Sequence, residues 1–318
     1  MNLKIQNILW ILILFISNFY TLDSFSQAET PLIYRQYLNL NKNSKKIKEA
    51  KIQKSVEVIT ANSKTDTAAI YYFDNMGNII QELIRMPDTT SKENKYFYLN
   101  YSYKYDKDNR LIEKIDSTNN ILKKTELEYD DNGTITKEVE YDSKYKRIRE
   151  ISYDYDALLR LIESTEINTT DKIITTYAYD SYSNMTKVNI KNSSGDAGSK
   201  SGNSTYVYKY DNKDNIIEKQ TLIPGGGYKT ETFKYDSKGV LTESYEISGR
   251  DTYTEFIYYY DKSFNKIKVE KTETSGDNKS SYTELISYDN FGNVIEDQNK
   301  GSNSEIISGT KYFYEYYK

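Results

Sequence analysis

Carboxylates are the side chains of this sequence that could carry acid–base chemistry. The 318 residues include 47 Asp and Glu but no His and no Cys. This composition excludes a Ser-His-Asp triad, a catalytic thiol, a disulfide framework and a zinc site with Cys and His ligands. Two carboxylates about 5 to 9.5 Å apart would be enough for a glycosidase. The Asp residues, however, recur at one position of a repeat, where a turn explains all of them, so we expect no enzyme.

The repeat is marked by an aromatic residue followed by Asp, and successive copies lie 24 to 32 residues apart. The nine Asp residues, for which we predict a structural role in turns, are Asp74, Asp106, Asp130, Asp156, Asp180, Asp211, Asp236, Asp261 and Asp289. A tenth, degenerate copy ends the sequence at Tyr312-Phe313-Tyr314-Glu315. The repeating unit is thus about 25 residues long, with insertions tolerated at one point of the cycle.

Each unit has the pattern of a β-hairpin. Before the Asp, aromatic residues alternate with others, as in Tyr101, Tyr103 and Tyr105, which predicts a strand with one Tyr-lined face. The third residue after the Asp is often Gly, as at Gly133, which enters a left-handed conformation at low cost. An Asp that accepts a hydrogen bond from the backbone two residues on, followed by such a residue, predicts a tight turn with a bulge.

The residues after each turn predict how the second strand is buried. The fifth residue after the Asp is apolar in eight of nine copies, and the seventh is polar in all of them. Lys266 breaks the pattern at the fifth position, and the adjacent Ile267 suggests a one-residue slip there. Because positions five and seven share a face of an ideal strand, we expect both faces of the sheet to be only partly buried.

The number of hairpins predicts a curved wall. About ten hairpins give on the order of 20 strands, which would make a flat sheet close to 100 Å wide. Open sheets seldom exceed roughly ten strands without coiling or closing. We therefore expect an all-β fold of tandem antiparallel β-hairpin repeats that form a curled or spiral single sheet, with a Tyr-rich concave face. The Gly- and Ser-rich insertions at 193–203 and 224–227 are expected to be loops at one rim.

Tyrosine, with 34 copies, offers the best candidate ligand surface. Aromatic rings can stack on sugars or hold a peptide strand in a groove. Packing between cross-strand Tyr pairs would explain the same residues without any ligand. The candidates are Tyr103, Tyr105, Tyr153, Tyr155, Tyr177, Tyr179, Tyr208, Tyr210, Tyr235, Tyr258 and Tyr260.

Two turns also place oxygen ligands close together, as calcium would require. They are Asp106-Lys107-Asp108-Asn109 and Asp130-Asp131-Asn132-Gly133. Neither has the spacing of an EF-hand with its distal Glu. We therefore favour a turn role, and we expect no metal and no cofactor.

The N-terminus has the pattern of an export signal. Lys4 precedes an apolar run over 8–16, and Ser24 and Ser26 fit a cleavage site before Gln27. We predict a signal peptide at 1–26, a linker at 27–55 and a repeat domain at 56–318. The mature chain would have no transmembrane segment, because nine apolar residues are too few to span a bilayer. The protein would be exported from a bacterium to the periplasm, the cell surface or the medium.

The overall charge of −4 does not favour nucleic acid as a partner. One basic segment, at 42–54, holds six Lys against a single Glu. It is either a tether to an acidic surface or a solvated linker or short helix before the first strand, and the second interpretation is favoured.

The nine aromatic-Asp turns resemble the YD repeats of the Rhs family, whose pattern is Tyr-Asp-x-x-Gly-Arg-Leu. The copies most similar to it run from Tyr105 to Leu111 and from Tyr155 to Leu161. The resemblance covers roughly residues 56 to 318, and it implies successive hairpins that wind into a spiral wall. In large family members such a wall encloses a toxin or a folded C-terminal module. This sequence ends inside its last repeat and has no Asp-Pro dipeptide of the kind associated with release of that module.

We therefore expect an exported, non-enzymatic scaffold that binds a macromolecule through its Tyr-rich surface. The macromolecule would be a cell-envelope glycan or a partner protein. The alternative is a structural or shielding shell fragment that works beside a separately encoded toxin.

Overall fold

The computed structural model describes residues 47–61, 64–87, 96–118, 122–194, 203–223, 227–249, 252–290 and 292–316. The predicted signal peptide, the linker before residue 47, and residues 195–202 and 224–226 of the two insertions lie outside the described residues. A short helix at 47–49 precedes the first strand.

Twenty strands make up the described fold. They are β1 (Ile52–Ala61), β2 (Lys64–Phe73), β3 (Ile79–Pro87), β4 (Tyr96–Tyr105), β5 (Leu111–Asp116), β6 (Lys123–Tyr129), β7 (Ile135–Tyr141), β8 (Arg147–Tyr155), β9 (Leu161–Asn168), β10 (Asp171–Tyr179), β11 (Met185–Ser194), β12 (Ser204–Tyr210), β13 (Ile216–Ile223), β14 (Gly227–Tyr235), β15 (Leu241–Ser248), β16 (Thr252–Tyr260), β17 (Lys266–Ser275), β18 (Asn278–Tyr288), β19 (Val294–Lys300) and β20 (Ile306–Tyr316).

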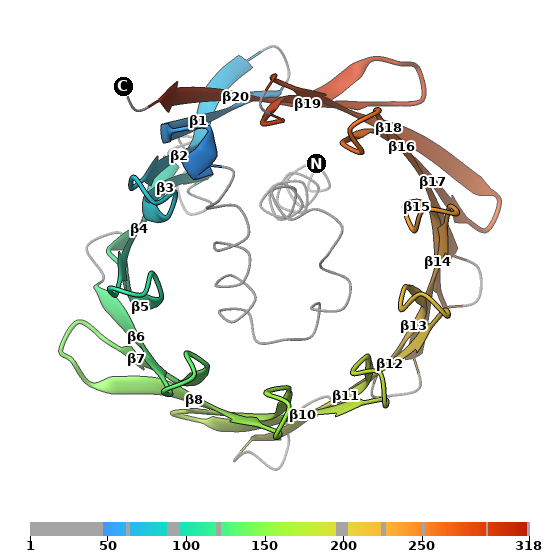
Figure 1. Ribbon diagram of the computed structural model, residues 1–318. Coiled ribbons are helices and arrows are strands. Elements are labelled where there is room, and N and C mark those ends of the chain that lie inside the picture. Colours follow the sequence, from blue (N-terminus) through green and yellow to red (C-terminus); the bar gives the residue numbers. More distant parts are fainter. Residues whose placement is uncertain are drawn as a thin grey trace.

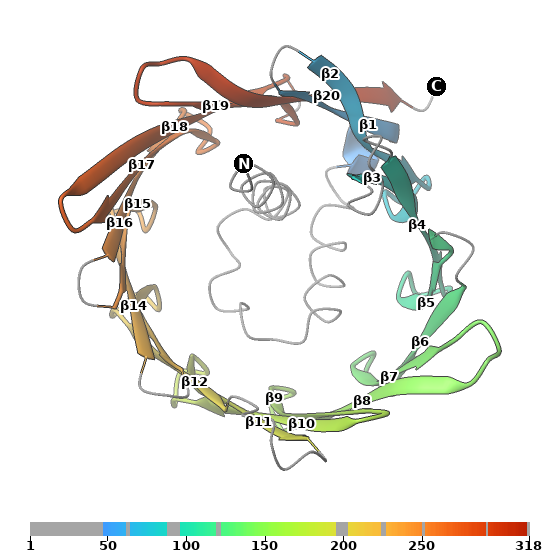
Figure 2. The same ribbon diagram turned by 180° about the vertical axis from the view of Figure 1, so that it is seen from behind.

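The sheet is a closed barrel. Each strand pairs antiparallel with the next along the chain, and β20 pairs with β1 over a register that runs from Ile52 opposite Tyr316 to Ala61 opposite Ser308. Figures 1 and 2 show the resulting ring from its two ends. The expected curled or spiral open sheet is therefore wrong, although its all-β, antiparallel hairpin character is correct.

Closure pairs β20, the last described strand, with β1, the first. β20 is the first strand of the tenth unit, and without a partner it would present a row of unpaired backbone groups at a sheet edge. β1, which precedes the first complete hairpin, supplies that partner. The wall therefore begins at Ile52, inside the segment that the sequence assigned to a linker.

The nine predicted turns all lie on one rim of the barrel, here called the YD rim, because each connects an even-numbered strand to the following odd-numbered one. In every one, the Asp N–H donates to the carbonyl of the fourth residue on, as Asp106 does to Arg110 over 2.9 Å. Among the described residues, the opposite rim holds two further turns with this backbone bond, one at Asp142, which follows Tyr141, and one at Gly301. The repeat pattern predicted neither.

A β-bulge after each of these turns decides which residues face inward. Tyr105 lies opposite Leu111, but Lys104 lies opposite Glu113, so Ile112 is the extra residue. The fifth residue after the Asp therefore points inward while the seventh points outward, and the eighth points inward again. The expectation that positions five and seven share a face is wrong for this reason.

The same register holds where a slip was expected. Lys266 lies opposite Tyr260, as Leu241 lies opposite Tyr235, and Ile267 takes the bulge position with 37% exposure. The Lys266 ammonium lies 3.6 Å from the Glu284 carboxylate, which gives this inward-facing cation a partner.

The core is a band of apolar side chains on the inner face near the YD rim. Its buried members are Tyr103, Leu111, Leu127, Ile135, Ile151, Tyr153, Leu161, Tyr177, Val188, Tyr208, Ile216, Phe233 and Leu241. The inner face is thus well buried, and it is not the half-covered surface that an ideal strand would give.

Candidate binding groove along the YD rim

All eleven tyrosines of the predicted ligand surface lie on the inner face, in two tiers. The first tier holds the Tyr of each Tyr-Asp pair, such as Tyr105, and the second holds the aromatic residue two positions earlier, such as Tyr103. Tyr103, Tyr153, Tyr177 and Tyr208 of the second tier are at most 9% exposed. The first-tier rings are only partly buried, so they offer more surface to a ligand.

First-tier hydroxyls connect successive repeats. The hydroxyl of Tyr179, for example, donates to the carbonyl of Leu161, the fifth residue after the Asp of the preceding repeat, over 2.8 Å. The same bond is made by Tyr105, Tyr129, Tyr155, Tyr210, Tyr235, Tyr288 and Tyr314. Burial raises the pKa of Tyr210 and of Tyr235 to about 12, so both hydroxyls keep their protons for this role.

Two second-tier hydroxyls donate to the eighth residue after the Asp of the preceding repeat. Tyr103 donates to Glu82 over 3.0 Å, and Tyr153 donates to Glu138 over 3.3 Å. These contacts and the first-tier bonds show that the Tyr ladder has a structural role.

The predicted turn role of the repeated Asp residues is also visible in atomic detail. The Oδ1 atom of Asp106 accepts hydrogen bonds from the backbone N–H of Asp108 and Arg110, and its Oδ2 atom accepts from the Arg110 side chain. In other repeats an Asn takes the place of this Arg, as Asn215 does when it donates to Asp211 over 2.9 Å. The residues of the two candidate calcium turns make these turn contacts.

A groove of about 560 Å³ runs along the YD rim on the inner side of four consecutive repeats. First-tier rings from β10, β12, β14 and β16 line it, together with apolar fifth-position residues and turn residues. The rings are those of Tyr179, Tyr210, Tyr235 and Tyr260. Asn184, Asp214 and Asn215 add polar groups that can exchange hydrogen bonds with a ligand. Four of the eleven predicted surface residues are thus brought into one groove.

Within the groove, the last repeat differs from the other three in two ways. Within the described part of the chain, the buried hydroxyl of Tyr260 has no hydrogen-bond partner, although eight other first-tier hydroxyls reach a carbonyl. Phe264 occupies the left-handed turn position at φ 63°, where four sister turns have Gly. Its ring is 54% exposed, lines the groove, and lies 5.2 Å from the Lys238 ammonium.

Phe264 is the groove residue that the sequence interpretation missed. A bulky side chain at positive φ is a conformational outlier, and such outliers cluster at functional sites. The available signal was the mismatch between Phe264 and the Gly or Asn expected three residues after Asp261.

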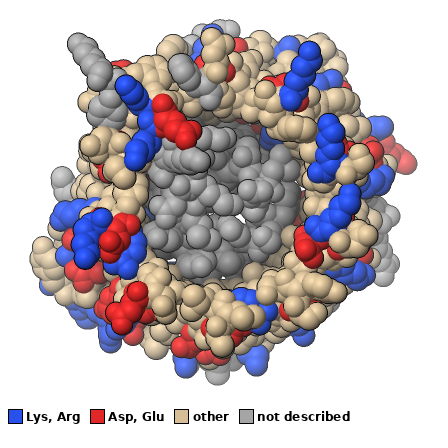
Figure 3. Space-filling view, viewed as in Figure 1, with Lys and Arg blue, Asp and Glu red and all other residues tan. Residues whose placement is uncertain are grey.

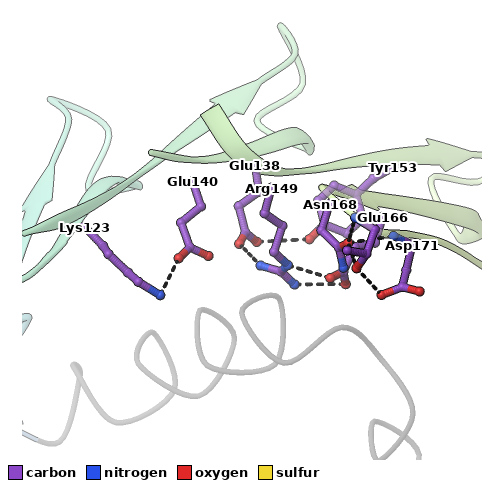
Figure 4. Close-up of polar contacts among 9 residues, drawn as sticks. Lys123, Glu138, Glu140, Arg149, Tyr153, Glu166, Asn168 and Asp171 are labelled. Carbon is purple, nitrogen blue, oxygen red and sulfur yellow. Dashed lines mark hydrogen bonds and ion pairs between the residues drawn. The ribbon is translucent and has the colours of Figure 1, made fainter. Parts of the chain in front are cut away.

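The inner wall below the apolar band carries a polar network, which Figure 4 shows from β6 to β10. The Arg149 guanidinium makes two hydrogen bonds to Glu166, of 2.7 and 3.0 Å, and one of 2.8 Å to Glu138. Burial raises the pKa of the Glu138 carboxyl, and the charge of Arg149 opposes this shift. These three bonds join Arg149 of β8 to Glu138 of β7 and to Glu166 of β9, so Arg149 stabilises the wall.

The outer wall carries ion pairs across neighbouring strands. Lys104 pairs with Glu113 at 2.5 Å, and two sister repeats place a Lys and a Glu at the corresponding positions. Those pairs are Lys209–Glu218 and Lys234–Glu243, at 2.7 and 2.6 Å. Figure 3 shows blue and red side chains distributed around the ring. In the described ranges, no group of three or more carboxylates is arranged to hold a metal ion.

Comparisons with known proteins give no family for the chain. No protein-family model and no curated protein matches it. Among solved structures it is similar, at 12% identity and a TM-score of 0.31, to a chain of the Photorhabdus luminescens Tc holotoxin pore. It is also similar, at 12% identity and a TM-score of 0.36, to a porin-like protein from Bacteroides uniformis.

The matched lengths of these two structures differ. The match covers 76% of this chain but 16% of the Tc-toxin chain, so the chain spans about a sixth of that protein. The match to the porin-like protein covers 84% of this chain and 97% of that one. Among the described residues, no helix is both long and apolar enough to cross a membrane.

Proposed function

We propose that the protein is a water-facing scaffold that binds an extended macromolecule in the groove of the YD rim. The observation that carries this proposal is the groove itself, in which the rings of Tyr179, Tyr210, Tyr235 and Tyr260 recur with each repeat and Phe264 is held at positive φ. We further propose that the segment at 1–26 exports the chain, which would expose the groove to envelope or extracellular ligands.

The outer wall supports the water-facing part of the proposal. A barrel embedded in lipid needs an outward apolar band about 25 Å tall. Here Lys104, Glu113, Lys234 and Glu243 form ion pairs on that outward face. Burying such pairs in hydrocarbon would be costly, so water is the expected surroundings of this wall.

The spacing of the groove supports an extended polymer as the ligand. The four rings come from every second strand, which places them about 10 Å apart at the usual strand separation. A ligand that contacts all four must therefore be long and chemically repetitive along its length. A glycan chain that stacks on the rings fits this description, and so does an extended polypeptide.

A second candidate function is a shell that encloses a partner polypeptide. The closed ring supports it, because twenty strands give a circumference of about 96 Å and a backbone diameter of at least about 30 Å. Barrels of this size enclose ligands or channels, and a helix with its side chains is only about 10–12 Å wide. Under this candidate, the resemblance to YD repeats would reflect a shared use of the wall as an enclosure.

The test is a screen of glycan and peptide arrays with the protein and two variants. Phe264→Gly removes the phenylalanine ring from the groove and leaves its four tyrosines in place. Leu159→Gly likewise replaces a large apolar residue by Gly at a left-handed turn position, but outside the groove. We expect the wild type and Leu159→Gly to share ligands that Phe264→Gly binds at least about tenfold more weakly. Equal binding by all three proteins, or no ligand on either array, would contradict the groove proposal.

A further inference from the structure

The β1–β20 ladder is the one junction of the barrel that no turn connects, because its strands come from opposite ends of the described chain. Other neighbouring strands are linked through a short connection, so local opening there is followed by rapid re-pairing. Opening of the ring should therefore start between β1 and β20.

The inner side of this junction buries two carboxylates at the level where another repeat buries Glu138, whose carboxylate pairs with Arg149. Glu57 of β1 is 7% exposed and Asp297 of β19 is 2% exposed. Thr310 of β20 lies between them, since its register partners are Ile59 and Asp297, and Glu57 is diagonal to it.

Charged and titratable groups from the neighbouring strands face these two carboxylates. They are Tyr71 of β2, Lys266 of β17, Glu284 of β18, and Tyr312 and Tyr314 of β20. Tyr71 donates to Glu57 over 3.3 Å, and Lys266 lies 3.6 Å from Glu284. The cluster thus brings the carboxylates of Glu57, Asp297 and Glu284 together with the Lys266 ammonium.

Two further groups indicate that the junction is poorly satisfied. The hydroxyls of Ser55 and Thr310 are buried without a hydrogen-bond partner in the described part of the chain, and these residues are 1% and 0% exposed. Unsatisfied buried polar groups destabilise the structure that contains them.

We propose that the β1–β20 junction is a proton-dependent closure of the ring, which is tight when Asp297 and Glu57 are protonated and opens locally when they ionise. An opened junction would give a large ligand lateral access to the inner wall. This inference does not depend on the groove being a binding site.

The titration of the cluster supports this direction. Burial, followed by the nearby Glu284 charge, raises the pKa of Asp297 to about 8. Burial raises the pKa of Glu57 to about 7, and the hydrogen bond from Tyr71 opposes the shift. Because both folded-state pKa values exceed those of unfolded chains, the folded state binds more protons between pH 4 and 8. The contribution of these two groups to stability is therefore fully present below that window and is lost as pH rises through it.

The test uses thiol labelling, which the absence of native Cys makes specific. Thr310→Cys reports on the junction, and Val188→Cys is the control. Both sites are 0% exposed, but the strand of Val188, β11, follows one of its two neighbours along the chain and precedes the other. Labelling rates are corrected for the pH dependence of a cysteine-containing peptide. We expect the ratio of the Thr310→Cys rate to the Val188→Cys rate to rise at least about tenfold from pH 6 to pH 9.

Adding Asp297→Asn should make this ratio much less dependent on pH. A ratio that stays constant in the parent protein, or that rises equally with Asp297→Asn present, would overturn the proposal. If Thr310→Cys does not fold, hydrogen exchange of β1 and β20 relative to β10 and β11, with and without Asp297→Asn, gives the same comparison. Equal loss of protection in the two strand pairs would then overturn it.

Discussion

The hydroxyl of Tyr235 donates a 2.8 Å hydrogen bond to the carbonyl of Ile216, which belongs to the preceding repeat. Ile216 is the first residue of β13, and it lies opposite Tyr210 of β12 beside the bulge. One aromatic residue per repeat therefore fixes the distance and angle to the neighbouring hairpin. This repeated contact explains why Tyr, rather than Phe, precedes most of the repeat Asp residues.

Removal of this hydroxyl should cost stability only where it has a partner. We expect Tyr235→Phe to lower the free energy of unfolding by about 0.5–1.5 kcal/mol, because the Ile216 carbonyl loses its donor. Tyr260→Phe should be neutral or slightly stabilising, since its hydroxyl has no partner among the described residues. Urea titration of both variants measures the two free energies of unfolding. Equal losses of stability would show that the hydrogen bond from the Tyr235 hydroxyl does not stabilise the repeat.

The left-handed turn positions give a prediction of the opposite sign. Leu159 and Phe264 have φ values of 59° and 63°, where a side chain costs about 1–2 kcal/mol. Because Gly also loses more entropy on folding, we expect Leu159→Gly and Phe264→Gly to stabilise the protein by about 0.5–1 kcal/mol. Leu158→Gly in the same turn is the control. Thermal unfolding should show a higher midpoint for the first two variants only.

The inner-wall network should be sensitive to the loss of one charge. Arg149→Ala leaves the Glu138 carboxylate, which belongs to a residue 1% exposed, without its cation. We expect the free energy of unfolding to fall by about 3–5 kcal/mol, which is the usual cost of removing one partner of a buried ion pair. The double variant Arg149→Met with Glu138→Gln should recover a large part of it. A double variant as unstable as Arg149→Ala would show that packing, and not charge, is what matters.

The turn carboxylates make the protein sensitive to acid. Hydrogen bonds from the Arg160 side chain and backbone lower the pKa of Asp156, and bonds from Asn265 lower that of Asp261. Since these folded-state pKa values lie below the ordinary value of 3.8, the stabilisation is present above that pH and is lost as pH falls through the lowered values. Unfolding monitored by circular dichroism should show this loss of stability at low pH. Asp156→Asn should weaken it, whereas Asp154→Asn, in the strand before the turn, should not.

Local rules were enough to predict the hairpins and their turns. Each turn depends on contacts within five residues, such as those of Asp106 with Asp108 and Arg110, so composition and spacing specify it. The number of strands followed from the same count of repeats. The alternation predicted that the tyrosines share one face, and the expected curling of the sheet placed that face on the concave side.

Closure could not be predicted in this way, because it depends on a pairing between Ile52 and Tyr316 that no local pattern encodes. The bulge was expected, but its effect on the following strand was not, so Glu113 was assigned to the wrong face. The groove depends on how four consecutive repeats curve together. Phe264 was not predicted, because the repeat pattern describes the residues that the copies share and not the position at which one copy differs from the others.

Closure of the ring is the claim on which the groove, the inner wall and the proton-dependent junction all depend, and a disulfide tests it directly. Val58 and Lys311 are register partners across the β1–β20 ladder, and paired residues of neighbouring antiparallel strands lie within disulfide range. In dilute solution, Val58→Cys with Lys311→Cys should oxidise to an intramolecularly linked monomer. Val58→Cys with Lys187→Cys of β11 should keep both thiols free. Free thiols or only intermolecular dimers in the first pair would contradict a closed barrel.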